Sequence, residues 1–380
     1  TTITTTADTV SYTANDSQAP LEMGGVEVYI DGIRTPLLMV SPNQVDVEIP
    51  FELIDTNSSS LYVRTLHSDG TVTVTTAVGI QITPAAPGVY ALPGPEPRVA
   101  IAQHYSTYAT GVISVDGTPT PGDTVTITIE DRAYSYQISA TDTINPADGD
   151  EGSTVRDALV AEINANSDEK VRATASSQFA RIILSAKTPG SAGENIAISA
   201  SATGQTVTSL TTGVITTSTP TETMTAINPA LCCANIAGAG VTEDNPAVPG
   251  EMIIIYGSGL GIVLPPLAQQ SIQDGAPYSG PLLNYPSPFS ASATVGGLTG
   301  NILFAGLQTG AIGVYQVVVQ MPSALSTNPV TPLTIAQNIY VSNIVTVPIF
   351  APTQTGTTGG PVAPPSSPYF RKKNPNQPRQ

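Results

Sequence analysis

Few residues in this chain of 380 have side chains that can carry acid–base or metal chemistry. Its two histidines, His67 and His104, are the only side chains whose unperturbed titration falls near neutral pH, and neither lies in a metal-ligand spacing such as HExxH. We expect both histidines on the surface, without a catalytic role. The sequence therefore predicts a protein that is not an enzyme.

A glycine-rich segment, GSGLG at 257–261, superficially resembles a phosphate-binding loop or the turn around a nucleophilic serine. Both motifs place a helix directly after the glycines. Here the chain continues with Val263, Leu264 and two prolines, a pattern that does not predict a helix. We therefore expect an ordinary turn, with no catalytic or cofactor-binding residue in it.

Oxygen-bearing side chains gather in one loop, at Asn145, Asp148, Asp150 and Glu151. Carboxylate and amide oxygens are the ligands that Ca²⁺ prefers, so Asp148, Asp150 and Glu151 are a candidate calcium site, although the spacing is not that of an EF-hand. The alternative is a solvated acidic loop whose charges suit the start of the helix that follows. We favour the solvated loop, and the sequence suggests no other cofactor.

The two cysteines of the chain, Cys232 and Cys233, are adjacent. They can close a strained ring with each other, remain buried thiols, or cross-link neighbouring chains in an oxidising compartment. Because there is no third cysteine, any disulfide of ordinary geometry has to be intermolecular. The sequence leaves these three alternatives open.

Composition excludes several classes of partner. Only 11% of the residues are charged, and 13 Lys and Arg against 29 Asp and Glu give a net charge of −16. Binding to nucleic acid or to anionic membranes needs clustered basic residues, so we expect neither. No apolar run of about 18 residues is present, so we expect no membrane span. The basic residues do cluster in the last ten positions, which hold four of the thirteen and no acid, and the preceding 370 residues carry −20.

Alternating apolar and polar residues predict β-strands throughout the first hundred positions, at 26–30, 44–49, 61–64 and 71–74. Asp31-Gly32 and Asp69-Gly70 lie at breaks in this pattern, where tight turns favour Asp-Gly. We expect an immunoglobulin-like antiparallel sandwich over 16–105 and a second one over 227–350.

An internal repeat supports this pair of sandwiches. Gly24-Gly25 leads to Gln44 and then Pro50, and Gly296-Gly297 leads to Gln316 and then Pro322, with equal spacing in both copies. Equal spacing predicts the same turn, the same strand register and the same exit bend, because a slip of one residue would turn every side chain to the other face.

Residues 106–226 interrupt the repeat and predict a β-rich inserted domain. Strand patterns surround one convincing helix at about 153–166, in which Val155, Leu159 and Ile163 recur every four residues as an apolar stripe. The insert is long enough to form a domain of its own. The fold class expected for the whole chain is mainly β, with two sandwiches and this insert.

An ordered set of motifs resembles a protein family. The motifs lie at 249–261, 293–297, 303–307 and 313–322, and similar motifs lie at 37–45, 49–53 and 84–90. The family is the uncharacterised C-terminal domain of secreted acidobacterial proteins, the Solibacter-type domain. The resemblance covers about 200 residues and implies Ig-like sandwiches of the IPT/TIG type and export, without a known activity or catalytic residues to transfer. The insert more weakly resembles β modules of phage tails and bacterial surface proteins.

The chain ends suggest contacts between subunits. Compared with the family, the first sandwich begins late and lacks a strand. Residues 1–15 are expected to form an arm that can act as a strand. Residues 351–380 are expected to form a Pro-rich basic tail, whose charge is opposite to that of the acidic body. Only two lysines lie before position 371, so edge strands have little charge protection against pairing. The residues expected at such contacts are Ile3, Val10, Tyr12, Tyr369, Phe370, Arg371, Lys372 and Lys373. The alternative is that both ends are disordered, as termini commonly are.

We therefore predict a secreted, non-enzymatic structural protein that assembles with copies of itself into an extracellular filament or sheath, by donation of the arm as a strand. The chain starts at Thr1 without Met, so we expect removal of a signal peptide and an extracellular or cell-surface location. The alternative function is adhesion or glycan binding, because tyrosines such as Tyr105 and Tyr108 can stack on sugars.

Overall fold

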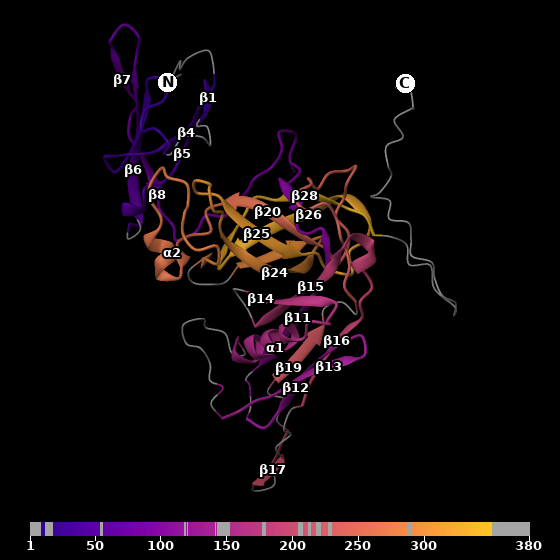
Figure 1. The fold of residues 1–380 in the computed structure, drawn as a ribbon. Coiled ribbons are helices and arrows are strands. Elements are labelled where there is room, and N and C mark those ends of the chain that lie inside the picture. The colour runs from indigo at the N-terminus through magenta and orange to yellow at the C-terminus, as the bar shows by residue number, and fades with distance from the viewer. Residues whose placement is uncertain are drawn as a thin grey trace, which may run out of the picture.

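The computed structural model describes residues 9–11, 18–53, 56–117, 119, 121–140, 142, 153–176, 180–203, 208–211, 214–217, 222–226, 230–286 and 291–351. The predicted fold class is confirmed: the protein is mainly β, its sheets are antiparallel, and the longer of its two described α-helices lies in the insert (Figure 1). No helix of the described part is long and apolar enough to cross a membrane.

Sandwich 1, at one end of the molecule, consists of two small sheets (Figure 1). One sheet has the order β1 (Val10–Ser11), β4 (Leu37–Val40) and β5 (Val45–Val47). The other has the order β3 (Ile33–Arg34), β2 (Val26–Ile30), β6 (Ser58–Leu66) and β7 (Val72–Val74), with β8 (Val78–Gln81) also on β6. A 3-10 turn, Phe51–Leu53, follows β5. The buried core between the sheets is small: Met23, Val26, Val28, Leu37 and Val40.

Sandwich 2 forms the centre of the molecule. Its strands follow the order β10 (Ala102–His104), β20 (Met252–Ser258), β25 (Tyr315–Gln320), β24 (Leu298–Leu307), β23 (Ala291–Val295), β26 (Asn328–Gln337) and β27 (Tyr340–Val341). β9 (Gly88–Val89) pairs with β20, and β28 (Val345–Ile349) pairs with β26. A small hairpin of β21 (Val263–Leu264) and β22 (Tyr285–Pro286) and the short helix α2 (Pro266–Gln270) complete it.

The insert packs α1 (Ser153–Ala165) against a four-stranded sheet of order β14 (Val171–Ala175), β15 (Arg181–Pro189), β11 (Tyr108–Gly117) and β19 (Glu222–Ala226). A second sheet joins β13 (Arg132–Gln137), β12 (Thr124–Ile129) and β16 (Ile198–Ala202). A 3-10 turn (Gly190–Gly193) and a hairpin of β17 (Thr208–Thr211) and β18 (Val214–Thr217) complete it. Val155, Leu159 and Ile163 are fully buried, which confirms the apolar stripe of the helix.

Strand pairing divides the chain differently from the expected boundaries at 105 and 226. β9 and β10 both pair with β20 of sandwich 2, so the last strand of sandwich 1 is β8, which ends at Gln81. At the other boundary Cys232 pairs with Thr110 of β11, and Leu231 lies in the insert core. Two- and three-residue strands give no alternating pattern of their own, which is why the sequence did not place them.

The repeat is reproduced at its two ends but not between them. Gly24 and Gly25 have φ angles of 59° and 79°, and Gly296 and Gly297 have 58° and 80°, so the opening turns match. The exit bends match too: the backbone N–H groups of Leu53 and Leu325 donate to the carbonyls of the prolines three residues earlier, at 3.2 and 3.4 Å.

The expectation of a common strand register is wrong. In sandwich 1 Val40 lies opposite Val45, whereas in sandwich 2 Leu307 lies opposite Tyr315, which shifts the pairing by several residues relative to the repeat. Asp31 and Gly32 adopt φ angles of 53° and 80° and turn the chain back on itself. Leu303 and Phe304 hold the matching positions in sandwich 2, where β24 continues through a bulge.

Sandwich 2 has very different junctions with its two neighbours. The insert packs on it through an apolar cluster that includes Val112, Ile183, Met252, Leu303 and Val318. Sandwich 1 meets it through polar contacts: the Phe51 N–H donates to Asp274 Oδ1 at 3.1 Å, and the Gly275 N–H donates to Glu48 Oε2 at 2.5 Å. Beside Glu48 lies a small recess lined by Phe51, Tyr278 and Tyr315.

Candidate functional sites

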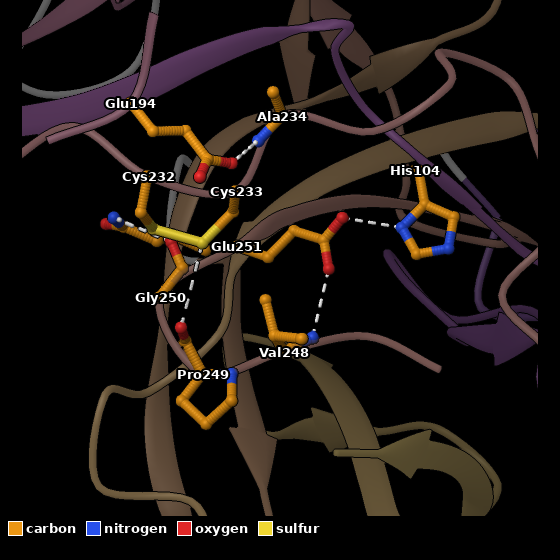
Figure 2. Close-up of a disulfide and its surroundings, with 10 residues drawn as sticks. His104, Glu194, Cys232, Cys233, Ala234, Val248, Pro249, Gly250 and Glu251 are labelled. Atoms are coloured by element: carbon orange, nitrogen blue, oxygen red, sulfur yellow. Dashed lines mark hydrogen bonds and ion pairs between the residues drawn. A yellow bond between two sulfur atoms is a disulfide. The ribbon is translucent and has the colours of Figure 1, made fainter. Parts of the chain in front are cut away.

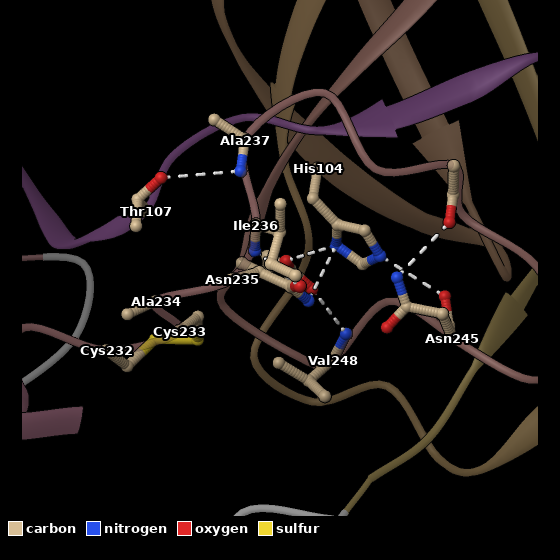
Figure 3. Close-up of polar contacts among 12 residues, drawn as sticks. His104, Thr107, Cys232, Cys233, Ala234, Asn235, Ile236, Ala237, Asn245 and Val248 are labelled. Carbon is tan, nitrogen blue, oxygen red and sulfur yellow. Dashed lines mark hydrogen bonds and ion pairs between the residues drawn. A yellow bond between two sulfur atoms is a disulfide. The ribbon is translucent and has the colours of Figure 1, made fainter. Parts of the chain in front are cut away.

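His104 is completely buried, contrary to the expectation of a surface residue. It ends β10, and its Nδ1 lies 2.5 Å from Oε1 of Glu251, while its Nε2 lies 3.2 Å from the carbonyl oxygen of Asn245 (Figure 3). Oε1 of Glu251 and the carbonyl oxygen of Asn245 are thus the oxygen partners of the two ring nitrogens.

The histidine–glutamate pair is closed to a substrate. Glu251 is 3% exposed, and its Oε2 accepts a hydrogen bond of 2.9 Å from the Val248 backbone. The Asn235 side-chain nitrogen lies 3.2 Å from His104 Nδ1, and the Asn235 oxygen accepts from the Ile236 backbone (Figure 3). Every polar atom of the pair faces protein, so its role is to hold the 235–251 segment on β10. His67, in contrast, is half-exposed, and its Nε2 lies 2.6 Å from Thr73 Oγ1.

Cys232 and Cys233 form a disulfide with each other (Figure 2). Their Cα atoms lie 3.7 Å apart, and Cys233 has a φ of 72°. This is the first of the three alternatives that the sequence left open, the ring between neighbours. Cys232 pairs with Thr110 of β11 through backbone bonds of 2.9 and 3.1 Å, while Cys233 Sγ lies 3.8 Å from the Pro249 carbonyl oxygen. The ring thus lies where the insert returns to sandwich 2.

The ring and the buried pair together make a structural junction. The chain between them is fixed on both sides, since the Ala234 N–H donates to Glu194 Oε1 at 3.1 Å and the Asn235 N–H donates to the Ser106 carbonyl at 3.0 Å (Figure 2). Within the part of the chain that the structure describes, no group of three or more His, Cys, Asp or Glu side chains is placed to hold a metal ion.

The glycine-rich segment 257–261 contacts the linker between the two sandwiches. A Cβ added at Gly259 would lie 2.0 Å from the Ala86 carbonyl oxygen, and one added at Gly261 would lie 2.5 Å from that of Pro84. The glycines therefore allow close approach of two backbones. A helix does follow, contrary to expectation, but α2 has five residues and begins at Pro266.

A second candidate site is exposed and lies on the outer face of sandwich 1. We define this outer face by residues of β2, β3, β6 and β7 that point away from the core: Glu27, Tyr29, Arg34, Tyr62, Arg64, Leu66, Val72 and Val74. The strand pairing places them in rows, with Arg34 beside Tyr29, Tyr29 beside Tyr62, and Arg64 between Glu27 and Val74. These residues come from four strands and are brought together only by the sheet.

Glu27 organises the charged part of the outer face. Arg34 donates to its Oε1 and Arg64 to its Oε2, each at 2.5 Å, and the Tyr29 hydroxyl donates to Oε2 at 3.1 Å. Glu27 is 7% exposed, and its burial alone would raise its pKa. The hydrogen bonds from Arg64 and Tyr29 and the two guanidinium charges outweigh burial, so the pKa of Glu27 lies below its ordinary value.

The remaining residues of the outer face are aromatic and apolar. The rings of Tyr29 and Tyr62 are stacked, with centroids 4.9 Å apart and planes 6° from parallel. Leu66, Val72 and Val74 leave 44%, 47% and 54% of their surface exposed. The alternating pattern of 26–30 and 61–64 indicated that Glu27, Tyr29, Tyr62 and Arg64 point away from the core, but not that β2 and β6 are neighbours.

Most other residues singled out in the sequence lie outside the described residues: Ile3, Tyr12, Asp148, Asp150, Glu151, Tyr369, Phe370, Arg371, Lys372 and Lys373. Val10 is described and lies opposite Val40 at the edge of its own sandwich. Tyr105 packs against the apolar cluster at the insert junction, while Tyr108 is 42% exposed.

Comparison with known proteins gives weak matches. No family model matches the chain, and no curated protein matches it. A Ca²⁺-stabilized adhesin with which an Antarctic bacterium binds ice is 13% identical, with a TM-score of 0.15, over 87% of this chain and 66% of that one.

A 1.5-MDa bacterial ice-binding adhesin is 12% identical with a TM-score of 0.15, over 86% of both chains. The I9–I11 tandem of titin is 9% identical with a TM-score of 0.15, over 86% of this chain and 88% of that one. These are weak resemblances, and the chain is not assigned to a family.

Proposed function

We propose that this chain is a non-enzymatic adhesion protein of the cell surface that makes contact through sandwich 1. One observation carries the proposal: the outer face of sandwich 1 presents stacked tyrosines, two partly exposed arginines and three exposed aliphatic residues on one sheet. Exposed apolar residues next to aromatic and arginine side chains are typical of binding surfaces. The proposal includes export with removal of a signal peptide.

The arrangement of the three units supports separate roles for sandwich 1 and for the rest of the molecule. The insert and sandwich 2 share an apolar cluster, so they form a support. Sandwich 1 stands at one end of the molecule, and its β6–β7 sheet lies on the far side from its β1–β4–β5 sheet (Figure 1). A contact surface at the end of a stable support is a natural geometry for adhesion.

The proposal is tested with beads that carry the intact protein and are applied to bacterial and animal cells. The variant Leu66→Ser/Val72→Ser/Val74→Ser removes the aliphatic part of the outer face. Val330→Ser/Val341→Ser makes a similar change at exposed positions of sandwich 2. We expect the first variant to lose most bead attachment and the second to keep it. Equal attachment by both variants would contradict the proposal.

A second candidate function is self-assembly into a filament or sheath, and the position of the arm favours it. Val10 and Ser11 pair with Val40 and Met39 at the edge of the β1–β4–β5 sheet. The arm of a neighbouring copy can make the same backbone hydrogen bonds, which is how strand exchange joins subunits. The basic tail and the acidic body would add electrostatic attraction between copies.

Deletion of residues 1–15 tests this second function. We expect the intact chain to sediment as a concentration-dependent polymer and the shortened chain as a monomer. Assembly by the shortened chain, or a monomeric intact chain at high concentration, would exclude strand exchange.

A further inference from the structure

We propose that the outer face of sandwich 1 binds a saccharide bearing an isolated carboxylate, a uronate, with Arg34 and Arg64 contacting the carboxylate and the stacked tyrosines contacting the sugar ring. This inference rests on the proposed adhesion function and names its ligand. It is carried by the guanidinium groups, the aromatic stack and the shape of the face.

The two guanidinium groups retain donors for a ligand. Each carries five N–H bonds, and one N–H group of each donates to Glu27. The Arg34 and Arg64 side chains are 40% and 36% exposed. Glu27 fixes their direction and offsets one of their two charges, and the carboxylate of Glu22 also attracts Arg64. A planar guanidinium matches the two oxygens of a carboxylate better than an ammonium group does.

Arg34 and Arg64 share one carboxylate on a molecule that is acidic as a whole. Elsewhere Lys170 pairs with Glu130, Arg156 pairs with Asp157, and Arg181 donates to the backbone of β24. A net charge of −16 disfavours a dense polyanion, whose charges extend over the whole surface. A single carboxylate on an otherwise neutral sugar chain can contact the two guanidinium groups directly, and repulsion from acids more than about 8 Å away is largely screened.

The shape and chemistry of the outer face suit a sugar polymer. Small ligands bind in concave pockets, whereas this face is one side of a sheet, so it fits an extended chain. The rings of Tyr29 and Tyr62 and the exposed aliphatic side chains offer apolar surface to sugar C–H groups. Tyrosine combines that apolar body with a hydroxyl that can hydrogen-bond.

Calorimetry with the intact protein tests the inference. The probe is a xylo-oligosaccharide that carries one glucuronate, and the control probe is the same oligosaccharide without it. We expect at least tenfold tighter binding of the glucuronate form. The variant Arg34→Lys/Arg64→Lys keeps the two positive charges and their attraction to Glu27 but lacks the planar guanidinium groups. We therefore expect at least a tenfold loss of affinity for the glucuronate probe, with an unchanged melting temperature.

Arg132→Lys is the matched control, because Arg132 lies on the insert, 46% exposed and 3.6 Å from Glu169. It should bind like the natural protein. Equal affinity for the two probes, or an unaffected double variant, would overturn the inference. A sulfated oligosaccharide that binds as tightly as the uronate would overturn the assignment to carboxylates. If the beads still attach to cells while neither probe binds, the ligand assignment is wrong and the proposed adhesion function is unaffected. If the beads do not attach and neither probe binds, both proposals are wrong.

Discussion

Sandwiches 1 and 2 share one sequence repeat, yet they differ in how much apolar surface they bury. Among the described residues, the buried hydrophobic cluster of sandwich 2 has twenty-seven members, and that of sandwich 1 has five, beside which Ile30 of β2 is also buried. Val319 is fully buried, whereas Val47, its counterpart in the repeat, is only half-buried. Because burial of apolar surface dominates folding stability, the repeat has produced one strong and one weak unit.

The difference between the two copies begins at one dipeptide. Asp31-Gly32 reverses the chain in sandwich 1, while Leu303 and Phe304 keep β24 running through its bulge. The insert is bonded to the backbone at this bulge: Ser176 Oγ donates to the Leu303 carbonyl at 2.9 Å and Arg181 to the Ile302 carbonyl at 2.5 Å. A local change of turn chemistry thus decides which copy supports the insert.

The largest expected effect concerns the buried pair that ties the insert to sandwich 2. Glu251→Leu removes the buried oxygen atoms that contact His104 Nδ1 and the Val248 N–H, and the loss of a buried hydrogen-bond partner costs about 1 to 3 kcal/mol for each group left behind. Urea unfolding should show this loss. Glu194→Gln is the control, because its amide oxygen still accepts from the Ala234 N–H, and we expect less than about 1 kcal/mol. Equal small losses would show that the pair does not stabilise the strong unit.

Matched core truncations compare the two sandwiches directly. Val319→Ala removes buried methyl groups from sandwich 2 and should cost about 2 to 3 kcal/mol, from roughly 0.8 kcal/mol per methylene plus a cavity. Val47→Ala, at the matching position, should cost less than about 1 kcal/mol because Val47 is half-buried. Both values come from urea unfolding. A larger loss for Val47→Ala would reverse the ranking of the two cores.

The opening turns allow a finer comparison. Gly25 and Gly297 have φ angles of 79° and 80°, so alanine strains either backbone by about 1 to 2 kcal/mol. A Cβ at Gly297 has nothing within 4 Å, whereas one at Gly25 lies 2.4 Å from the Leu66 carbonyl oxygen. We expect Gly25→Ala to lower the melting temperature further than Gly297→Ala. Equal shifts would mean that the two turns have the same surroundings.

The smallest expected effect is a pH dependence of the junction between the sandwiches. Burial, and then the nearby Asp274, raise the pKa of Glu48 to about 7, although the Gly275 N–H lowers it. Burial and Glu52 raise the pKa of Asp274 to about 6. Tyr315 also faces Glu48 across the recess. Both carboxyls are thus protonated in the folded junction at pH values where they ionise in water.

The junction is therefore fully stabilised below about pH 4 and loses on the order of 1 kcal/mol as pH rises through 6 and 7. Small-angle scattering at pH 5 and pH 8 should show greater separation of sandwich 1 at the higher pH. Glu48→Gln should reduce this change, and Glu243→Gln, at an exposed position outside the junction, should not. A pH response that Glu48→Gln leaves intact would place its origin elsewhere.

Local patterns predicted much of the fold. Alternation located β2 and β6, and the spacing of Val155, Leu159 and Ile163 located α1, because these signals lie within a few residues. The site was harder to predict. His104 is buried by a partner 147 positions away, and the outer face forms only when four strands pair. No local pattern carries such distant contacts.

Hydrogen–deuterium exchange tests most directly the claim that sandwich 1 is a weakly attached contact unit on a rigid support. Slow exchange reports the free energy of opening for each segment. We predict that amides of β2 and β6 exchange through openings of clearly lower free energy than amides of β20 and β25, and that β11 of the insert exchanges like β20. Equal protection of β2 and β20 in the intact protein would contradict the account.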